Sequence, residues 1–336
     1  MPNQREEGAP GRGPLSTLEP ADGKIMSVPE SLRGLGWELP HVFLGLDESS
    51  SAFDRARTVI LPVPYEATTS YGGGTAGGPR AILEASRYIE LYDQELDAEP
   101  WESGVATLPQ LELTGAGGAE AMAELREAYD RLLDASADRF LVLLGGEHSL
   151  SGPPIAAWVD RLRARGQRMS VLQVDAHTDL RPEYEGSPHS HAAVMHRIHE
   201  DVESLVAVGV RALTSQEVEL VRARDNLHVF YADHIHHSDD WIDDAVSRLG
   251  DHVYITFDVD GFDPTLVPST GTPEPGGLQW YPVLKLLRRV FETRKVHAAD
   301  IVELAPIPGL HAPDFLVAKL LYKMVGYRHA LPRRIA

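Results

Sequence analysis

Hydrophobic positions along this chain form short continuous runs that alternate with longer segments of helical periodicity. The short runs are rich in Val, Ile and Leu and have the length of a buried strand. Predicted strands begin at Thr58, Arg139, Ser170, Leu205, His228, His252 and His297. Predicted helices begin near Pro79, Glu120, Gly152, Ala192, Ser215, Trp241, Trp280 and Pro313. This alternation is typical of βαβ units around a mostly parallel sheet, so the predicted fold class is α/β.

The alternation continues from residue 58 to residue 330 without an interdomain linker or an internal repeat. We therefore predict one catalytic domain over residues 51–336, preceded by a partly disordered N-terminal extension over residues 1–50. The extension is rich in Gly, Pro and charge, and lacks the apolar stretch of about 7 to 15 residues that a secretory signal needs. No run approaches the roughly 20 apolar residues of a membrane span. A cytoplasmic protein with no membrane partner is expected.

Charge and cysteine content narrow the chemistry. The chain has 31 Lys and Arg against 50 Asp and Glu, a net charge of −19 with histidines neutral. A broad surface for nucleic acid is therefore not expected, and small cations are the more plausible ligands. Cys is absent, which excludes a disulfide scaffold, a thiolate metal site and a cysteine nucleophile. Any metal must be held by His and carboxylate side chains.

Carboxylates and imidazoles gather where three predicted strands end. They are His148, which follows two glycines, then Asp175, His177 and Asp179 in one motif, and Asp258 and Asp260 in another. Within each motif these residues occupy alternate positions, so their side chains would project to one side if strand geometry persisted. Because open parallel sheets bind ligands outside the carboxyl ends of their strands, we expect the three motifs to converge.

Four carboxylates in one pocket resist joint ionisation unless cations are present. A ligand set rich in oxygen with some imidazole suits Mn²⁺, while Ni²⁺, Co²⁺ and Zn²⁺ remain alternatives. Six ligands are too many for one catalytic ion with an open position, so two ions per subunit with bridging carboxylates are predicted. A water between such ions becomes hydroxide near neutral pH and is a strong nucleophile.

Each motif taken alone has a structural explanation. An Asp pair after a strand is usually a turn or a helix cap, and a lone His is more often a hydrogen-bonded loop residue than a ligand. The motif DAHTD is harder to explain in this way, because three polar groups on one face are costly to bury without a cation. The three motifs together favour a binuclear site.

These motifs resemble those of the ureohydrolases, the arginase and agmatinase family, and are most similar to those of agmatinases. They are GGEHS at 145–149, DAHTDLR at 175–181, SHA at 190–192, DVDGFDP at 258–264, STGTPEPGG at 269–277 and DIVELAP at 300–306. The resemblance extends from about Val59 to Met324. It implies an arginase-like three-layer α/β/α sandwich with a central parallel sheet of about eight strands. It also implies a binuclear manganese centre held by all six residues above, with Asp175 and Asp258 as bridging ligands.

The resemblance assigns further roles. His191 is expected to be a proton shuttle at the mouth of the site and to contact the substrate, whereas the neighbouring His189 is expected to be a loop histidine. Glu303 is expected to hold the substrate guanidinium, whose planar fork of donors matches a carboxylate. The alternative for Glu303 is a buried acid paired with an Arg. Asp179 is expected to pass a proton to the departing amine.

The implied reaction is hydrolysis of a guanidino group to urea and an amine, with agmatine giving putrescine as the first choice. The residues after the ligand motif, DLR and then Tyr-Glu-Gly, favour agmatine by resemblance. An inward-facing Arg181 would instead favour an acid-tailed substrate such as 4-guanidinobutyrate, unless Glu183 or Glu185 neutralises it. 3-Guanidinopropionate, arginine and guanidine are further alternatives. Arg181 is counted as a substrate-binding residue.

Two rival functions and two other motifs complete the expectations. A non-catalytic metal-binding paralogue would be expected to have lost ligands, and a deacetylase would use a single zinc. A homo-oligomer, a trimer or hexamer, is expected from the family.

The glycine-rich loop YGGGTAGGP at 71–79 lacks nucleotide-binding spacing and is expected on the active-site side. The stretch DHIHHSDD is expected to be a solvated turn before a helix near Ser238 or Asp239.

Overall fold

The computed structural model describes residues 42–114, 118–136 and 138–331. Within them, eight strands form one parallel sheet in the order β2-β1-β3-β8-β7-β4-β5-β6. The strands are β1 (Thr58–Val63), β2 (Val105–Thr107), β3 (Phe140–Gly145), β4 (Ser170–Val174), β5 (Ser204–Val210), β6 (Leu227–Tyr231), β7 (His252–Asp258) and β8 (Lys295–Val302). The prediction of a central parallel sheet of about eight strands is confirmed.

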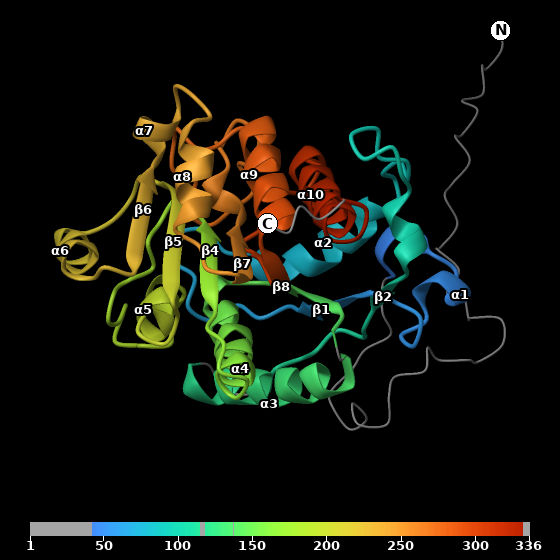
Figure 1. Ribbon diagram of the computed structural model, residues 1–336, viewed down its shortest axis with the longest axis horizontal. Helices are drawn as coiled ribbons and strands as arrows, with labels where there is room; N and C mark the ends of the chain where they lie inside the picture. Colours follow the sequence, from blue (N-terminus) through green and yellow to red (C-terminus); the bar gives the residue numbers. More distant parts are fainter. Residues whose placement is uncertain (1–41, 115–117, 137, 332–336) are drawn as a thin grey trace, which may run out of the picture.

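Helices cover both faces of the sheet, with α3, α4 and α5 on one side and α2, α8, α9 and α10 on the other (Figure 1). The helices are α1 (Glu48–Ser51), α2 (Gly78–Ser86), α3 (Ala119–Ser136), α4 (Gly152–Arg163), α5 (Val194–Ile198), α6 (Ser215–Ala223), α7 (Ala232–Ile235), α8 (Trp241–Ser247), α9 (Trp280–Thr293) and α10 (Ala312–His329). This arrangement confirms the predicted three-layer α/β/α sandwich.

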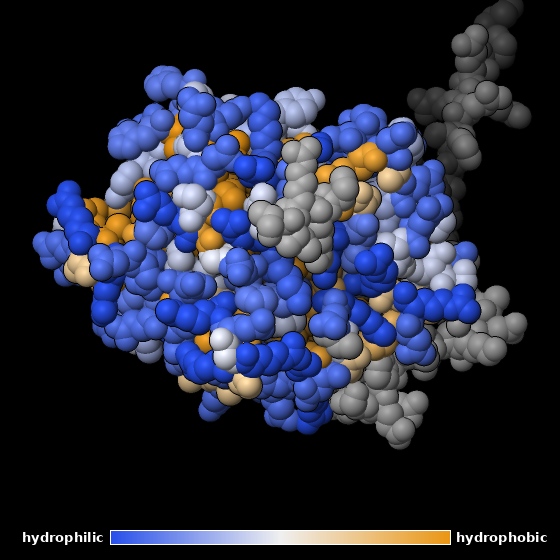
Figure 2. Space-filling model, viewed as in Figure 1, coloured by the Kyte–Doolittle hydropathy of each residue, from blue (hydrophilic) through white to orange (hydrophobic). Residues whose placement is uncertain are grey.

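Two hydrophobic cores explain why the strands read as continuous apolar runs. Every residue of β1 is buried, because its side chains point alternately into the two layers. Val59 and Leu61 pack with α3 and α4, whereas Ile60 packs with α2 and α10. Strands buried on both faces show no polar alternation. By contrast, the face of the molecule in Figure 2 is mainly hydrophilic, with apolar residues showing only in small areas.

The predicted elements differ from the structure at a few short segments. Strand β2 was not predicted, because three residues are too few to show a pattern. Helix α7 occupies the start of the stretch expected to be a turn. The next helix begins at Trp241, as the helical pattern predicts, and not at Ser238 or Asp239 as the composition of the turn suggested. The helix expected near Ala192 begins as a 3-10 turn over His191–Ala193 that leads into α5.

The predicted N-terminal extension falls partly outside the described residues, since 1–41 are not among them. Residues 42–50 are joined to the domain by hydrogen bonds from two backbone N–H groups to side-chain hydroxyls. The Phe43 N–H donates to Thr107 Oγ1 at 3.0 Å, and the Leu44 N–H donates to Ser86 Oγ at 2.8 Å. Both side chains are buried. Across the described ranges, none of the helices has both the length and the apolar content to cross a membrane.

Candidate metal and substrate site

Four strands that are adjacent in the sheet, β3, β8, β7 and β4, carry the predicted metal ligands and Glu303 at or just beyond their carboxyl ends. A cavity of about 440 Å³ opens there. The predicted residues that line it are His177, Asp179, Arg181, His191, Asp258, Asp260 and Glu303. His148 and Asp175 are fully buried and contact this set. The expected convergence of the three motifs at one edge of the sheet is therefore observed.

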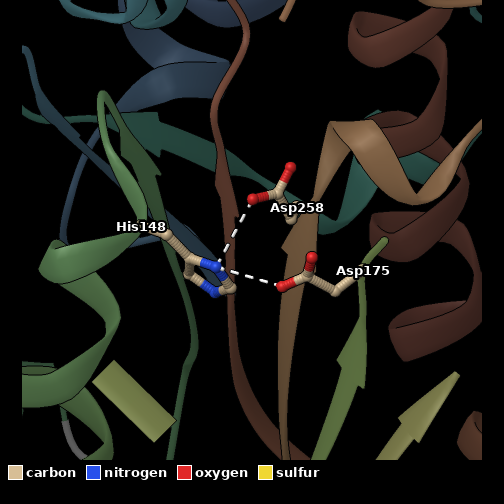
Figure 3. Close-up of side chains that lie close together, drawn as sticks. All are labelled: His148, Asp175 and Asp258. Carbon is tan, nitrogen blue, oxygen red and sulfur yellow. Dashed lines mark ion pairs between the residues drawn. The ribbon is translucent and has the colours of Figure 1, made fainter. Parts of the chain in front are cut away.

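His148 stands at the centre of the first group of ligand-type side chains. Its Nδ1 lies 2.9 Å from Asp179 Oδ2, 3.2 Å from Asp175 Oδ2 and 3.4 Å from Asp258 Oδ2. Figure 3 shows the imidazole facing the carboxylates of Asp175 and Asp258. Potential ligand atoms of His148, Asp175 and Asp258, from three different strand ends, thus lie within 4.8 Å of one another, as a metal ion would require. Asp179 joins them through its contact with His148 Nδ1.

A second group shares one member with the first. His177 Nδ1 lies 2.9 Å from Asp260 Oδ2 and 3.6 Å from Asp175 Oδ1. Asp175 therefore directs one oxygen toward each histidine, which is the arrangement of a bridging ligand. Asp258 also faces His148 through its Oδ2. Its Oδ1 accepts a hydrogen bond from the Asp260 N–H at 2.8 Å, just as Asp175 Oδ1 accepts one from the His177 N–H at 2.6 Å.

The ligand motif after β4 reaches the site in a loop rather than in a strand. β4 ends at Val174, so the strand alternation considered for Asp175, His177 and Asp179 does not apply. Asp179 has a left-handed backbone with φ of 51°, which is uncommon for a residue other than Gly. Its carbonyl accepts hydrogen bonds from the N–H groups of Met195 and His196, near the start of α5. The loop is therefore held in an unusual conformation by its neighbours.

A buried carboxylate that the sequence did not reveal holds the same loop. Glu217, in the first turn of α6, accepts hydrogen bonds from Thr178 Oγ1 at 2.7 Å and from the Leu180 N–H at 3.2 Å. Its other oxygen accepts from the N–H and the hydroxyl of Thr214, which completes a capping box. Glu217 thus joins the ligand loop to the start of α6.

A second unpredicted pair orients His148. The hydroxyl of Thr256 donates to Asp300 Oδ1 at 2.7 Å, and therefore accepts from His148 Nε2 at 2.8 Å. With the proton on Nε2, the lone pair of Nδ1 faces the three carboxylates and finds no hydrogen bond of acceptable geometry among the described residues. A lone pair aimed at carboxylate oxygens is repulsive without a cation. Burial lowers the pKa of His148, but the contacts with the carboxylates of Asp175, Asp179 and Asp258 outweigh it and raise that pKa well above its usual value, so without a metal ion a proton takes the place of the cation at Nδ1. Partners of this kind orient metal-ligating histidines.

The electrostatics of the cluster also fit divalent cations. Burial, together with the charges of Asp260 and Asp175, raises the pKa of Asp258 well above its usual value. Burial and the charge of Asp175 likewise raise the pKa of Asp179. These carboxylates therefore resist joint ionisation when only protons are available. Divalent cations relieve that repulsion, so the donor set fits the metal centre that its residues suggest.

His191 lines the cavity beside two hydroxyl groups. Its Nδ1 lies 3.3 Å from Thr68 Oγ1, and its Nε2 lies 3.5 Å from Ser70 Oγ. The buried Glu147 fixes this segment, because it accepts hydrogen bonds from the N–H and the hydroxyl of Thr68 at 2.6 and 2.8 Å. His189 does not line the cavity, in keeping with its predicted place in a loop.

Glu303 follows β8 and is buried beside the cluster. Its Oε1 accepts a hydrogen bond from the His148 N–H at 2.6 Å, and its backbone has a φ of 66°. Burial raises the pKa of Glu303 to about 8. No Arg or Lys among the described residues forms an ion pair with it, so the alternative of a structural Arg pair is not observed. Its second oxygen is only 3.9 Å from where a Cβ on Gly271 would lie.

Arg181 lies on the wall of the cavity, with its guanidinium carbon 4.9 Å from the centre of the Tyr184 ring. The same ring packs edge-on against His191 at 5.6 Å. Glu183 and Glu185 are exposed and do not line the cavity, and no carboxylate of the described residues pairs with Arg181. The acids considered as neutralising partners of Arg181 therefore do not play that part.

The glycine-rich loop is closed by a carboxylate of the chain itself. Glu66 accepts hydrogen bonds from the N–H groups of Gly74 and Ala76 and from the hydroxyl of Thr75. These are the donors that a phosphate would use, so the loop has no phosphate cradle to offer. The same loop meets the cavity wall where the Gly72 N–H donates to Gly271 O. Its expected position on the active-site side agrees with this contact.

Comparison with known proteins gives the class to which this fold and site belong. The model of the arginase family matches residues 56–326. The N(1)-aminopropylagmatine ureohydrolase of Synechocystis sp. is 39% identical over 284 residues, which span 83% of this chain and 92% of that protein. The agmatinase of Pyrococcus horikoshii is 35% identical over 283 residues, 80% of this chain and 90% of that protein.

A solved structure agrees with these relatives. The crystal structure of the agmatine ureohydrolase of Thermoplasma volcanium superposes with a TM-score of 0.73 and 26% identity, over 84% of this chain and 94% of that one. The fold and the site thus define a metal-dependent hydrolase of the α/β class. The chain belongs to the arginase family, and the predicted resemblance to agmatinase-like ureohydrolases, enzymes that act on guanidino groups, is confirmed.

Proposed function

We propose that this protein hydrolyses the guanidino group of an amine-tailed substrate, with agmatine giving putrescine and urea. The observation that carries the proposal is the position of Glu303, a buried carboxylate in the same cavity as Asp179, Asp258 and Asp260. A guanidinium group bound to Glu303 would place its carbon next to the carboxylate–imidazole cluster. Pre-positioning of this kind supplies much of the rate of such reactions.

The ligands of the proposed centre are His148, Asp175 and His177, together with Asp179, Asp258 and Asp260. When bound, two divalent cations would acidify water to a nucleophile near neutral pH and neutralise the carboxylates. We propose Mn²⁺, with Ni²⁺, Co²⁺ and Zn²⁺ as alternatives, because oxygen donors outnumber imidazoles in the set. A trimer or hexamer and a cytoplasmic location remain predictions.

The chain's own residues orient the substrate and move protons. Glu303 would bind the guanidinium through two parallel hydrogen bonds, and the arriving positive charge would favour its ionised form although burial raises its pKa to about 8. Asp179 would accept a proton from the attacking water and pass it to the nitrogen of the departing amine. His191 would exchange protons with bulk water, with Thr68 and Ser70 close enough to hold its ring.

N(1)-aminopropylagmatine is a second candidate substrate, because the Synechocystis relative at 39% identity carries that name. It also has an amine tail, so it differs from agmatine in length rather than in the sign of its charge. 4-Guanidinobutyrate is the third candidate, supported by Arg181 on the cavity wall, which forms no ion pair with an acid in the described part of the chain. 3-Guanidinopropionate, arginine and guanidine complete the set to be compared.

The test is urea release by the Mn²⁺-loaded protein, with kcat/KM compared across all six compounds. We expect the amine-tailed compounds to exceed the acid-tailed ones, and a preference for 4-guanidinobutyrate would overturn the choice of tail. Asp258→Ala should lose metal retention and urea release together. Unchanged turnover in that variant would refute the metal centre, whereas metal binding without turnover of any compound by the wild type would indicate a non-catalytic paralogue.

A further inference from the structure

We propose that Glu274 is the specificity-determining residue that binds the cationic tail of the substrate. This inference rests on the proposed function, because it concerns the same cavity and an amine-tailed guanidine. Glu274 belongs to the loop after the third ligand motif, that of Asp258 and Asp260, and lines the cavity together with Glu303. A substrate with a guanidinium at one end and an ammonium at the other needs two anionic contacts, and Glu303 supplies only the first.

Glu274 is singled out by the hydrogen bonds of the other acids in the cavity wall. Asp179, Asp258 and Asp260 belong to the metal-type cluster. Glu217 is saturated by Thr178, Leu180 and Thr214. Glu303 is held by the His148 N–H. The carboxylate of Glu274 alone in this lining forms neither a hydrogen bond nor an ion pair with any side chain or backbone group of the described residues, so it is available to a ligand.

The backbone of Glu274 is nevertheless firmly anchored. The Arg211 guanidinium donates to the carbonyl of Glu274 from Nε at 3.1 Å and from a terminal nitrogen at 2.8 Å. The same guanidinium donates to the carbonyls of Asp260 and Phe262 at 2.6 and 3.2 Å. Arg211 therefore ties the loop of Glu274 to the turn that carries Asp260. This contact fixes the position of Glu274 relative to the proposed metal ligands.

A second anchor lies on the other side of Glu274. Asp263 accepts hydrogen bonds from the N–H groups of Gly276 and Gly277 at 3.0 and 3.1 Å. A fixed backbone with a free carboxylate is an arrangement suited to binding, because little loop entropy is lost when the ligand arrives. The contrast with Glu217, whose carboxylate is consumed by the fold, shows that the chain does not use Glu274 to hold itself together.

Neither of the two cations in the cavity wall, Arg181 and Arg211, forms an ion pair with the Glu274 carboxylate among the described residues. Arg211 directs its donors to backbone carbonyls, including that of Gly209. It interacts with the Glu274 carboxylate only through its charge, without a hydrogen bond or an ion pair among the described residues. Arg181 is stacked over Tyr184, an arrangement that satisfies part of its charge through the ring. An ammonium tail thus meets the free carboxylate of Glu274, whereas a carboxylate tail would be repelled by it.

The experiment compares Glu274→Gln with the wild type in the Mn²⁺-loaded protein. Three guanidines of equal chain length are used: agmatine, 4-guanidinobutyrate and the uncharged-tail analogue n-butylguanidine. We expect kcat/KM for agmatine to fall by roughly 10- to 100-fold, the effect of losing one charge-assisted hydrogen bond. The value for n-butylguanidine should stay the same, and that for 4-guanidinobutyrate should rise. Inhibition by 1,4-diaminobutane should weaken in parallel with the loss for agmatine.

Glu183→Gln is the matched control, because it removes the same charge from an exposed position outside the cavity lining. It should leave the ratio of agmatine to n-butylguanidine unchanged. Equal losses for both compounds in Glu274→Gln would reveal a structural role and overturn the inference, as would an unchanged agmatine value. Failure of the wild type to release urea from any amine-tailed guanidine would instead overturn the proposed function, so the two failures are distinguishable.

Discussion

His148 and Thr256 lie 2.8 Å apart, from Nε2 to Oγ1, and this contact decides which nitrogen of His148 faces the carboxylates. Thr256→Val keeps the shape of the side chain but removes the acceptor for the Nε2 proton. The proton is then free to move to Nδ1, where it would compete with a metal ion. We expect Mn²⁺ affinity to fall roughly 10- to 100-fold, as measured by isothermal titration calorimetry.

Thr256→Ser is the control for this prediction, because it retains the hydroxyl and the bond to Asp300. It should bind Mn²⁺ nearly as well as the wild type. If Thr256→Val binds the metal as tightly as Thr256→Ser does, the hydroxyl has no part in orienting His148.

Asp175 and Asp260 should differ in how many metal ions their loss removes. Asp175 directs Oδ2 toward His148 and Oδ1 toward His177, whereas Asp260 faces only His177. We expect the wild type to retain two Mn²⁺ ions per chain after desalting, Asp260→Asn one, and Asp175→Asn none. Elemental analysis of the desalted proteins gives these numbers directly. Two ions retained by Asp175→Asn would contradict the bridging role.

We expect Glu217 to stabilise the folded protein, although it is not one of the proposed metal ligands. Its carboxylate accepts bonds from Thr178, Leu180 and Thr214. In Glu217→Gln an amide N–H₂ replaces one accepting oxygen and meets donors. We expect the free energy of unfolding to fall by about 2 kcal/mol, measured by urea denaturation. Glu219→Gln, at an exposed position of the same helix, should change it very little.

The contrast between predicted and unpredicted site residues has a physical cause. Ligands such as His148 and Asp175 stand in compact motifs, where several polar groups at a strand end are hard to bury without a cation. Glu217 acts on Thr178 from 39 residues away, and Thr256 acts on His148 from 108 residues away. Such contacts exist only once the sheet order is known, and hydrophobic pattern does not specify sheet order.

The sequence nevertheless carries a weak indication of the contact between Thr256 and Asp300. Thr256 and Asp300 are polar residues with apolar neighbours on both sides in the strand segments ITF and ADI. A polar side chain buried in a central strand needs a partner, and here each provides one for the other. The fold itself was more predictable, because β1, β3 and β7 are long runs buried on both faces. Strand β2, with three residues, shows no such pattern.

Acid should destabilise the protein through His297, which lies far from the cluster, near the start of β8. Its ring is buried between Trp158 and His252, and its Nε2 lies 2.8 Å from His252 Nδ1. Burial, and then the positive charges of Lys295 and His252, lower the pKa of His297 to about 3. The unfolded chain would take up a proton near pH 6.5, whereas the folded chain would not.

The contribution of His297 to the free energy of unfolding is therefore fully present above pH 6.5. It is lost as the pH falls from there toward 3. The expected loss is about 1.5 kcal/mol between pH 6.5 and pH 5. Urea denaturation at several pH values measures it, and His297→Gln should flatten the dependence by that amount. His234→Gln, at an exposed position, is the control and should keep the slope of the wild type. Parallel slopes for wild type and His297→Gln would show that His297 takes up its proton in the folded state.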